Sequence, residues 1–439
     1  MSEKKAKQQG GRTVVRPIGD RRAAIGFLVE HLNLRGHPES LPSLSEAQWQ
    51  AMAAEALRYR LGPLTYKRIT NGPRAQEIPE STREALRQAY IQNAFRNAIL
   101  ARETGAAARA LGERGIPVLL LKGQHLAYFE YADPALRSMA DIDIMVPRDR
   151  LAEAESVLVG LGYGPDPRPD LESYCAWSNH LAKLEKEGAE VIELHYAIER
   201  PTSPFRIDPA ALWARAVPSK HAGAAVWRLG TEDLLLHLCL HLAYHHQFDR
   251  AALKGLADMA TVIARNETEI DWRSLVDRSA EWEATPFVRC SLELARRLLG
   301  APVPESTIAA LGPDDGIADT VLQHVLAPTV ELPGSIEDQL RGEGGGRLGQ
   351  LLRSVFLPAS RMRELYGLPA GSHRVWPWYA VRMVDLITRR GSLMARLLAR
   401  TPDVRPTLDR DRDRDIIRRW ADRNAPPEGS PENRTEAAN

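Results

Sequence analysis

Apolar residues with helical spacing dominate the first quarter of the chain. Three segments place apolar side chains three or four positions apart, as an amphipathic helix does: 21–35, 45–61 and 81–114. The pattern changes at Gly115-Ile116-Pro117, and the apolar run Val118–Leu121 that follows is short enough for a buried strand. We therefore predict an N-terminal helical region over residues 20–115, followed by a segment that opens with a strand.

Residues 116–200 combine strand and helix patterns. After the first strand we expect a helix through Gln124–Tyr131, a strand at Asp141–Val146 and a helix from Arg148 to Leu161. The runs His180–Lys186 and Glu190–Ile198 flank a short turn and predict a β-hairpin. This segment is expected to be a mixed β-sheet core.

The remaining chain has no further strand pattern that we recognise. Residues 201–400 are predicted to form a C-terminal helical region, whereas 1–19 and the charged segment 401–439 are predicted to be flexible tails. The expected fold class is α+β, with the sheet core at 116–200 embedded in helical regions on both sides.

Composition excludes several classes of protein. The 439 residues are 44% hydrophobic and 26% charged, which is typical of a folded globular protein. Lys plus Arg number 58 against 57 for Asp plus Glu, so no net field attracts a polyanion, and nucleic acid is not favoured as a partner despite the basic stretch at 341–400. Three separated cysteines form no disulfide framework or thiolate zinc motif. No signal-peptide or membrane-spanning run is found, so a cytoplasmic location is expected.

Three acidic residues are placed on exposed strand faces by their spacing. Asp141 and Asp143 share one face of their predicted strand, and Glu193 shares a face with His195 on a later strand. Two carboxylates about 4 Å apart repel by roughly 4 kcal/mol at intermediate dielectric, so a cation between them is expected. Oxygen ligands of this kind suit Mg²⁺, and three carboxylates match a site for two ions in phosphoryl or nucleotidyl transfer.

Groups suited to phosphate binding lie between the first strand and these carboxylates. Lys122 and Gly123 follow the strand at the start of a helix, where backbone amides and one positive charge could meet a triphosphate. Arg137, four residues before Asp141, could add a bidentate contact to phosphate.

These residues resemble a known family, the uncharacterised nucleotidyltransferases of the polymerase-beta-like superfamily. The resemblance runs through Leu121-Lys122-Gly123, Arg137, Asp141-Ile142-Asp143 and Glu193-Leu194-His195, and covers roughly residues 85–390. It implies a minimal nucleotidyltransferase fold with Asp141, Asp143 and Glu193 as metal ligands. One departure is Gly123-Gln124, where the wider superfamily has Gly-Ser or Gly-Gly nearer to the first aspartate.

The expected activity is transfer of a nucleoside monophosphate from an NTP, with ATP as the expected donor, to an unidentified acceptor. Asp141, Asp143 and Glu193 would bind two Mg²⁺ or Mn²⁺ ions, while Lys122, Gly123, Gln124 and Arg137 would hold the nucleotide. The acceptor could be a small molecule, a peptide or a protein. Two alternatives stay open, which are a catalytically inactive nucleotide-binding protein and an NTP-dependent phosphotransferase.

Three histidines lie at helical spacing in a segment that begins at Thr231. His237, His241 and His245 extend over about 12 Å at 1.5 Å per residue, so they cannot all ligate one ion. A pair of them completed by Asp258 or His246 stays open. We favour a polar stripe that faces the active-site cleft or a neighbouring helix, and we take His195, His237 and His241 as candidates to line the site.

Overall fold

The computed structural model describes residues 18–35, 43–72, 74–165, 170–249, 252–327, 357–365, 368–369, 375–382 and 405–427. The chain divides into two compact units, one of Gly19–Leu326 with Asp413–Asn439 and one of Met1–Ile18 with Ala327–Arg412. The sheet and all of the residues proposed above for the site belong to the first unit. The predicted 1–19 tail, apart from its last two residues, and most of the basic stretch 341–400 lie outside the described residues.

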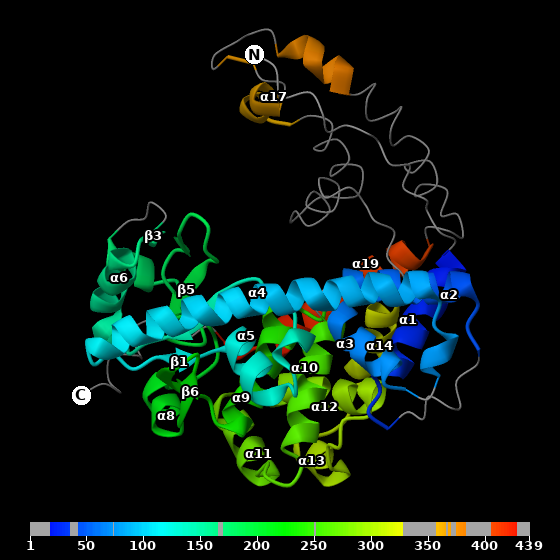
Figure 1. Ribbon diagram of the computed structural model, residues 1–439, viewed down its shortest axis with the longest axis horizontal. Helices are drawn as coiled ribbons and strands as arrows, with labels where there is room; N and C mark the ends of the chain where they lie inside the picture. Colours follow the sequence, from blue (N-terminus) through cyan, green and yellow to red (C-terminus); the bar gives the residue numbers. More distant parts are fainter. Residues whose placement is uncertain are drawn as a thin grey trace. The chain divides into compact units, whose positions relative to one another are not determined.

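Four helices form the N-terminal region: α1 (Ile18–Leu32), α2 (Glu46–Arg58), α3 (Gly62–Thr70) and α4 (Glu80–Glu113). Helix α4 has 34 residues, which at 1.5 Å per residue gives a length of about 50 Å. It contacts α2 and α3 as well as β7 and α6 (Leu151–Gly160), and the strands lie near its C-terminal end in Figure 1. The helix therefore connects the helical region to the sheet.

The described sheet has seven strands: β1 (Leu119–Leu120), β2 (Ile142–Met145), β3 (Gly164–Pro165), β4 (Leu184–Glu185), β5 (Ile192–His195), β6 (Val217–His221) and β7 (Ala224–Arg228). Their order is β3-β4-β5-β2-β1-β7-β6, with β2–β5 and β1–β7 parallel and the other pairs antiparallel. This mixed sheet among helices confirms the predicted α+β class.

The hairpin β6–β7 lies in a segment for which we predicted helices alone. It turns at Ala222-Gly223, and both residues have a positive φ, 46° and 78°. In β7 the side chains of Ala224 and Val226 are buried while Ala225 between them is exposed, which is the two-residue period of a strand. That short alternation was the sequence signal for two additional strands of the sheet.

Most of the remaining helices follow the core strands. They are α5 (Lys122–His125), α7 (Leu171–Cys175), α8 (Pro209–Ala214), α9 (Thr231–Leu240), α10 (Ala252–Arg265), α11 (Trp272–Glu281), α12 (Thr285–Leu299), α13 (Glu305–Ala310), α14 (Ile317–Leu326), α17 (Ala359–Leu365) and α19 (Arg405–Asn424). Short π-helical turns continue α5 at Leu126–Glu130 and α9 at His241–His245. None of the helices in the described ranges combines the length and apolar character needed to span a bilayer.

Helix α19 lies within the segment 401–439, which we predicted to be a flexible tail. Its side chains Ile417, Trp420 and Ala421 are buried and belong to the main hydrophobic core. Trp420 also donates a hydrogen bond from Nε1 to Asp315 at 2.6 Å. The alternating charges thus belong to a helix with one apolar side, which the charge pattern alone concealed.

The two faces of the sheet pack differently. Ile142, Ile144, Ile192 and Leu194 belong to a core cluster that includes apolar side chains of α4 and α6. Met145, on the other face of β2, belongs instead to the cluster with α9, α10 and α12. Because side chains alternate along a strand, the polar residues of β2 and β5 face this helical side.

A buried carboxylate ties α9 to two other elements of this helical side. Asp233 in α9 is fully buried and accepts hydrogen bonds from Arg215 Nε at 2.8 Å and from Arg278 Nη1 at 2.9 Å. Arg215 caps the C-terminus of α8, and Arg278 lies in α11. One side chain thereby links three helices that are separate in the sequence.

We expect Asp233→Ala to lower the free energy of unfolding by about 3–5 kcal/mol, because two partly buried arginines lose their shared counter-ion. Urea denaturation would measure the change. Asp277→Ala in α11 is the matched control, since that carboxylate is 65% exposed and its nearest basic nitrogen is 3.9 Å away. The control should change the free energy by less than about 0.5 kcal/mol. Equal effects of the two substitutions would contradict the assigned role of Asp233.

Candidate active site

The parallel pairing of β2 with β5 brings two of the predicted acidic residues together. Its register sets Asp143 opposite Glu193, so their side chains leave the same face of adjacent strands. Ligand atoms of Asp143, Glu193 and His195 all lie within 4.8 Å of one another, and this is the one such group of three or more among the described residues. The three side chains could therefore hold one metal ion.

Asp141 lies in the bend just before β2, two residues ahead of Asp143 and outside that group of three. Its pKa is raised by burial and, next, by the negative charges of Asp143 and Glu193. The side chain is thus close enough to both carboxylates to be repelled by them, and a divalent cation among the three would relieve that repulsion.

His195 contacts both carboxylates from β5. Its Nε2 lies 3.0 Å from Asp143 Oδ1 and 3.8 Å from Glu193 Oε2, while the buried Nδ1 has no hydrogen-bond partner among the described residues. Burial lowers the pKa of His195 although the hydrogen bond to Asp143 opposes the shift. The neutral ring then carries its proton on Nε2 and donates it to Asp143, because Nδ1 has no described acceptor. In this arrangement His195 orients Asp143.

Lys122 and Gly123 begin α5, directly after β1. Lys122 Nζ lies 3.7 Å from Asp143 Oδ1. Burial alone would raise the pKa of Asp143, but the charge of Lys122 and the hydrogen bond from His195 lower it well below its usual range. The φ angle of Lys122 is 28°, an unusual value for a residue with a side chain, and strain of this kind often accompanies functional sites.

Gly123 is closely surrounded. A Cβ atom at this position would lie 3.2 Å from Met139 Sδ and 3.4 Å from Arg137 Nη1. Gln124, in contrast, is fully buried, and neither atom of its amide group has a hydrogen-bond partner among the described residues. The backbone of Gly123 is therefore next to Arg137, whereas the side chain of Gln124 is closed to a nucleotide in this arrangement.

The structure pairs Arg137 with a carboxylate rather than leaving it free for phosphate. Its Nε and Nη2 donate hydrogen bonds to Asp258 Oδ1 and Oδ2, both at 3.0 Å. The phenol of Tyr131 donates a further bond to Oδ1 at 2.8 Å. This bidentate pair leaves Nη1 as the guanidinium nitrogen nearest Gly123, so a phosphate could meet one nitrogen of Arg137 rather than two.

Two lysines near the carboxylates were missing from the sequence-based assignment. Lys183 Nζ lies 3.3 Å from Glu193 Oε1, and Lys254 Nζ lies 3.9 Å from Asp258 Oδ2. Burial, followed by the charge of Arg137, lowers the pKa of Lys254 to about 8. The sequence signal for Lys254 was its place four residues before Asp258, on one face of α10.

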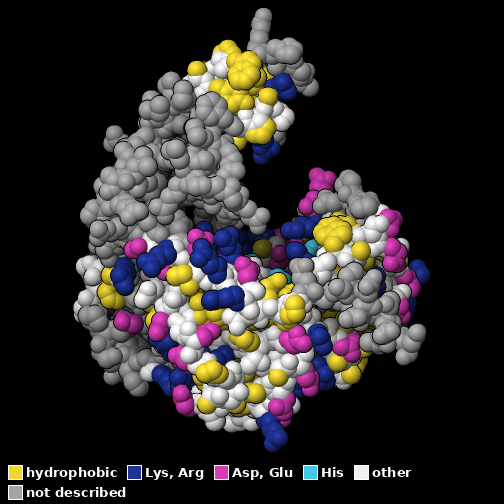
Figure 2. Space-filling model, turned by 180° about the vertical axis from the view of Figure 1, so that it is seen from behind, with side chains coloured by type: hydrophobic (Ala, Val, Ile, Leu, Met, Phe, Trp, Pro, Cys, Tyr) yellow, Lys and Arg dark blue, Asp and Glu magenta, His cyan; other side chains and the backbone are white. Residues whose placement is uncertain are grey.

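Two histidines of the predicted stripe, His237 and His241, lie near Lys122 and Asp143. His237 is buried in α9, and His241 begins the π-helical turn, where its Nε2 lies 3.1 Å from that of His246. Burial, and then the charge of Lys122, lower the pKa values of His237 and His241 well below the usual range. His245 Nε2 lies 2.7 Å from Glu199 Oε1. Figure 2 shows histidine atoms at the surface beside basic and acidic side chains.

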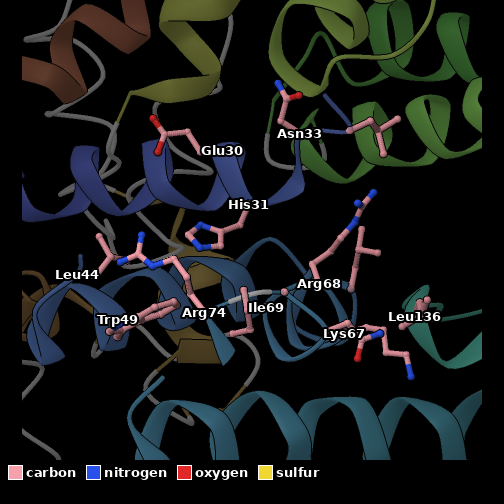
Figure 3. Close-up of a pocket in the computed structure, with 14 residues that line it drawn as sticks. Glu30, His31, Asn33, Leu44, Trp49, Lys67, Arg68, Ile69, Arg74 and Leu136 are labelled. Atoms are coloured by element: carbon pink, nitrogen blue, oxygen red, sulfur yellow. The ribbon is translucent and has the colours of Figure 1, made fainter. Parts of the chain in front are cut away.

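A cavity of about 450 Å³ lies elsewhere, among helices α1 to α3. His31, Trp49 and Arg68 line it with Leu136 (Figure 3), and none of the predicted site residues does. The cavity is therefore separate from the carboxylate group.

The charges around Asp258 and Asp141 predict that removing each carboxylate has a different effect on the free energy of unfolding. Asp258→Asn should lower the free energy of unfolding by about 3–5 kcal/mol, because Arg137 stays buried without its counter-ion. Asp141→Asn should leave that free energy unchanged or raise it, because repulsion from Asp143 and Glu193 is removed. Urea denaturation of both variants provides the comparison. Destabilisation of the same size in both would show that Asp141 is a structural counter-ion.

Comparisons with known proteins identify the family of this chain. The sequence pattern of the family described as uncharacterised nucleotidyltransferase matches residues 45–300, more than half of the chain. No curated protein matches. One solved structure, that of the antibiotic-resistance factor ANT(2'')-Ia, is similar at 14% identity over 40% of this chain and 92% of that chain, but the TM-score of 0.26 is too low to bear on the site. On the family match, this protein belongs to the uncharacterised nucleotidyltransferase family.

Proposed function

We propose that the protein transfers a nucleoside monophosphate from an NTP to an acceptor in a reaction that depends on a divalent cation. The observation that carries the proposal is the parallel register of β2 and β5, which pairs Asp143 with Glu193, and the charges of both residues act on Asp141. Membership of a nucleotidyltransferase family supports the reaction class. ATP is the donor that we would test first, and the acceptor is a small molecule, a peptide or a protein.

The reaction joins an acceptor oxygen to the α-phosphorus and breaks the bond from that phosphorus to the oxygen that bridges to the β-phosphate. Pyrophosphate leaves, and the acceptor proton passes to a base. Glu193 is our candidate to orient the acceptor and take this proton, since its side chain is 16% exposed and lies next to Asp143. Lys122, at the start of α5, would attract the phosphates to the carboxylates.

The donor set fits divalent cations. Asp141, Asp143 and Glu193 offer carboxylate oxygens, the ligands that Mg²⁺ and Mn²⁺ favour. Bound ions would neutralise the carboxylates and stabilise negative charge on the reacting phosphate groups. His195 would hold Asp143 in position through the hydrogen bond to Oδ1, and burial keeps its imidazole neutral.

Asp141→Ala and Asp143→Ala should each lower the transfer rate at least about a hundredfold, because the loss of a metal-binding carboxylate removes several kcal/mol of transition-state stabilisation. The assay incubates the protein with mixed NTPs, Mg²⁺ and candidate acceptors and identifies the added mass by mass spectrometry. Glu187→Gln, in the exposed turn between β4 and β5, is the control and should retain the wild-type rate.

An added mass of one phosphoryl group with release of ADP would replace the proposal with phosphotransfer. Wild-type protein that binds NTP but modifies no acceptor and releases no pyrophosphate would favour the inactive alternative. Near wild-type turnover in either aspartate variant would contradict the metal assignment.

Glu193→Gln tests the third carboxylate. If Glu193 acts on the acceptor side, this variant should still bind NTP with Mn²⁺ but fail to transfer, because the amide cannot accept the proton as a carboxylate does. Electron paramagnetic resonance of Mn²⁺ measures binding, and the mass assay measures transfer. Equal loss of binding and transfer would place Glu193 on the triphosphate side, and no loss of either would make it structural.

A further inference from the structure

Basic side chains also gather around a carboxylate of α10. Arg137 and Lys254 both approach Asp258, which is buried at 3% exposure and is their shared counter-ion. Two cations thus share one carboxylate within a largely buried group. The group holds one more positive than negative charge, so a second anion would be bound favourably there.

The ammonium of Lys254 is available to bind such an anion. Its nearest carboxylate oxygen, Asp258 Oδ2, is 3.9 Å away, beyond hydrogen-bond distance, and no described residue makes a hydrogen bond to it. The side chain keeps 22% of its surface exposed, so solvent and ligands can reach it. Arg137 differs, because Asp258 already takes two of its guanidinium nitrogens.

Lys254 also lies near the residues proposed for metal and phosphate. Lys254 and Arg137 both approach Asp258, and the charge of Asp141 is a minor influence on the pKa of Lys254 beside burial and the charge of Arg137. Arg137 Nη1 lies 3.4 Å from the position of a Cβ at Gly123, the residue that follows Lys122. These contacts connect Lys254, through Asp258 and Arg137, to Gly123 at the start of α5.

We propose that Lys254 of α10, beside Arg137 and Gly123, binds the polyphosphate chain of the NTP and the pyrophosphate that leaves. This inference rests on the proposed function and adds a residue of the helical region to it. A polyphosphate suits the arrangement because its oxygens can meet a lysine ammonium and the remaining guanidinium nitrogen together. Asp141, Asp143 and Glu193 would hold the cations. Lys254 and Arg137 would hold the phosphates.

Lys254→Met is the decisive variant. It removes one of two neighbouring cations and leaves the Arg137–Asp258 pair in place, so the protein should fold with an unchanged or higher melting temperature. The probe is inorganic tripolyphosphate with Mg²⁺, measured by isothermal titration calorimetry, because it needs no choice of base or acceptor. We expect tripolyphosphate to bind about ten- to a hundredfold more weakly, as for the loss of one charge-assisted contact.

Two matched variants complete the experiment. Lys220→Met removes an exposed lysine of β6 and should leave tripolyphosphate affinity unchanged. Lys254→Arg keeps the charge and should restore at least part of the affinity. Equal affinity of Lys254→Met and wild type would overturn the inference, as would an equal loss of affinity in both methionine variants.

The experiment separates this inference from the proposed function. Wild-type protein that binds tripolyphosphate through Lys254 yet transfers no nucleotide would support the phosphate site and contradict the proposed reaction. Wild-type protein that transfers nucleotide while Lys254→Met keeps full tripolyphosphate affinity would support the reaction and contradict the role of Lys254. Wild-type protein that binds no tripolyphosphate contradicts the inference directly.

Discussion

The pairing of β2 with β5 is the constraint on which the candidate site depends. The two strands are parallel, and the register sets Asp143 beside Glu193 while Ile142, Ile144 and Leu194 enter the core on the other face. A shift by one residue would exchange the two faces of a strand and bury the carboxylates among apolar side chains. Packing against α4 and α6 therefore fixes the position of the acidic residues as firmly as it fixes the core.

The helical side contributes chemistry as well as support. Asp258 holds Arg137 and approaches Lys254, so one buried carboxylate of α10 positions two cations near the loop after β1. Burial would raise the pKa of Asp258, but Arg137 and Lys254 lower it. The protein thus has a group of carboxylates on β2 and β5 and a group of cations around Asp258 of α10, and our proposals assign metal ions to the first and phosphates to the second.

His237 and His241 add polar atoms near Lys122 without adding charge at neutral pH. Burial is the main cause of the lowered pKa values of His237 and His241, and Lys122 reinforces it. The π-helical turn at His241–His245 brings His241 close to His246, five residues later, which a regular α-helix would place on a different side. His237 and His241 therefore stay uncharged near the positive charge of Lys122.

Local patterns in the sequence were sufficient for the α+β class and for the β4–β5 hairpin, since both depend on patterns over a few residues. The two-residue period of β6 and β7 was also present but short. The partner of Arg137 could not be predicted, because Asp258 lies 121 residues away and meets it through packing of α10. The register of β2 and β5, the burial of Gln124 and the position of Lys254 were likewise decided by tertiary structure, because each depends on contacts between segments that are distant in the sequence.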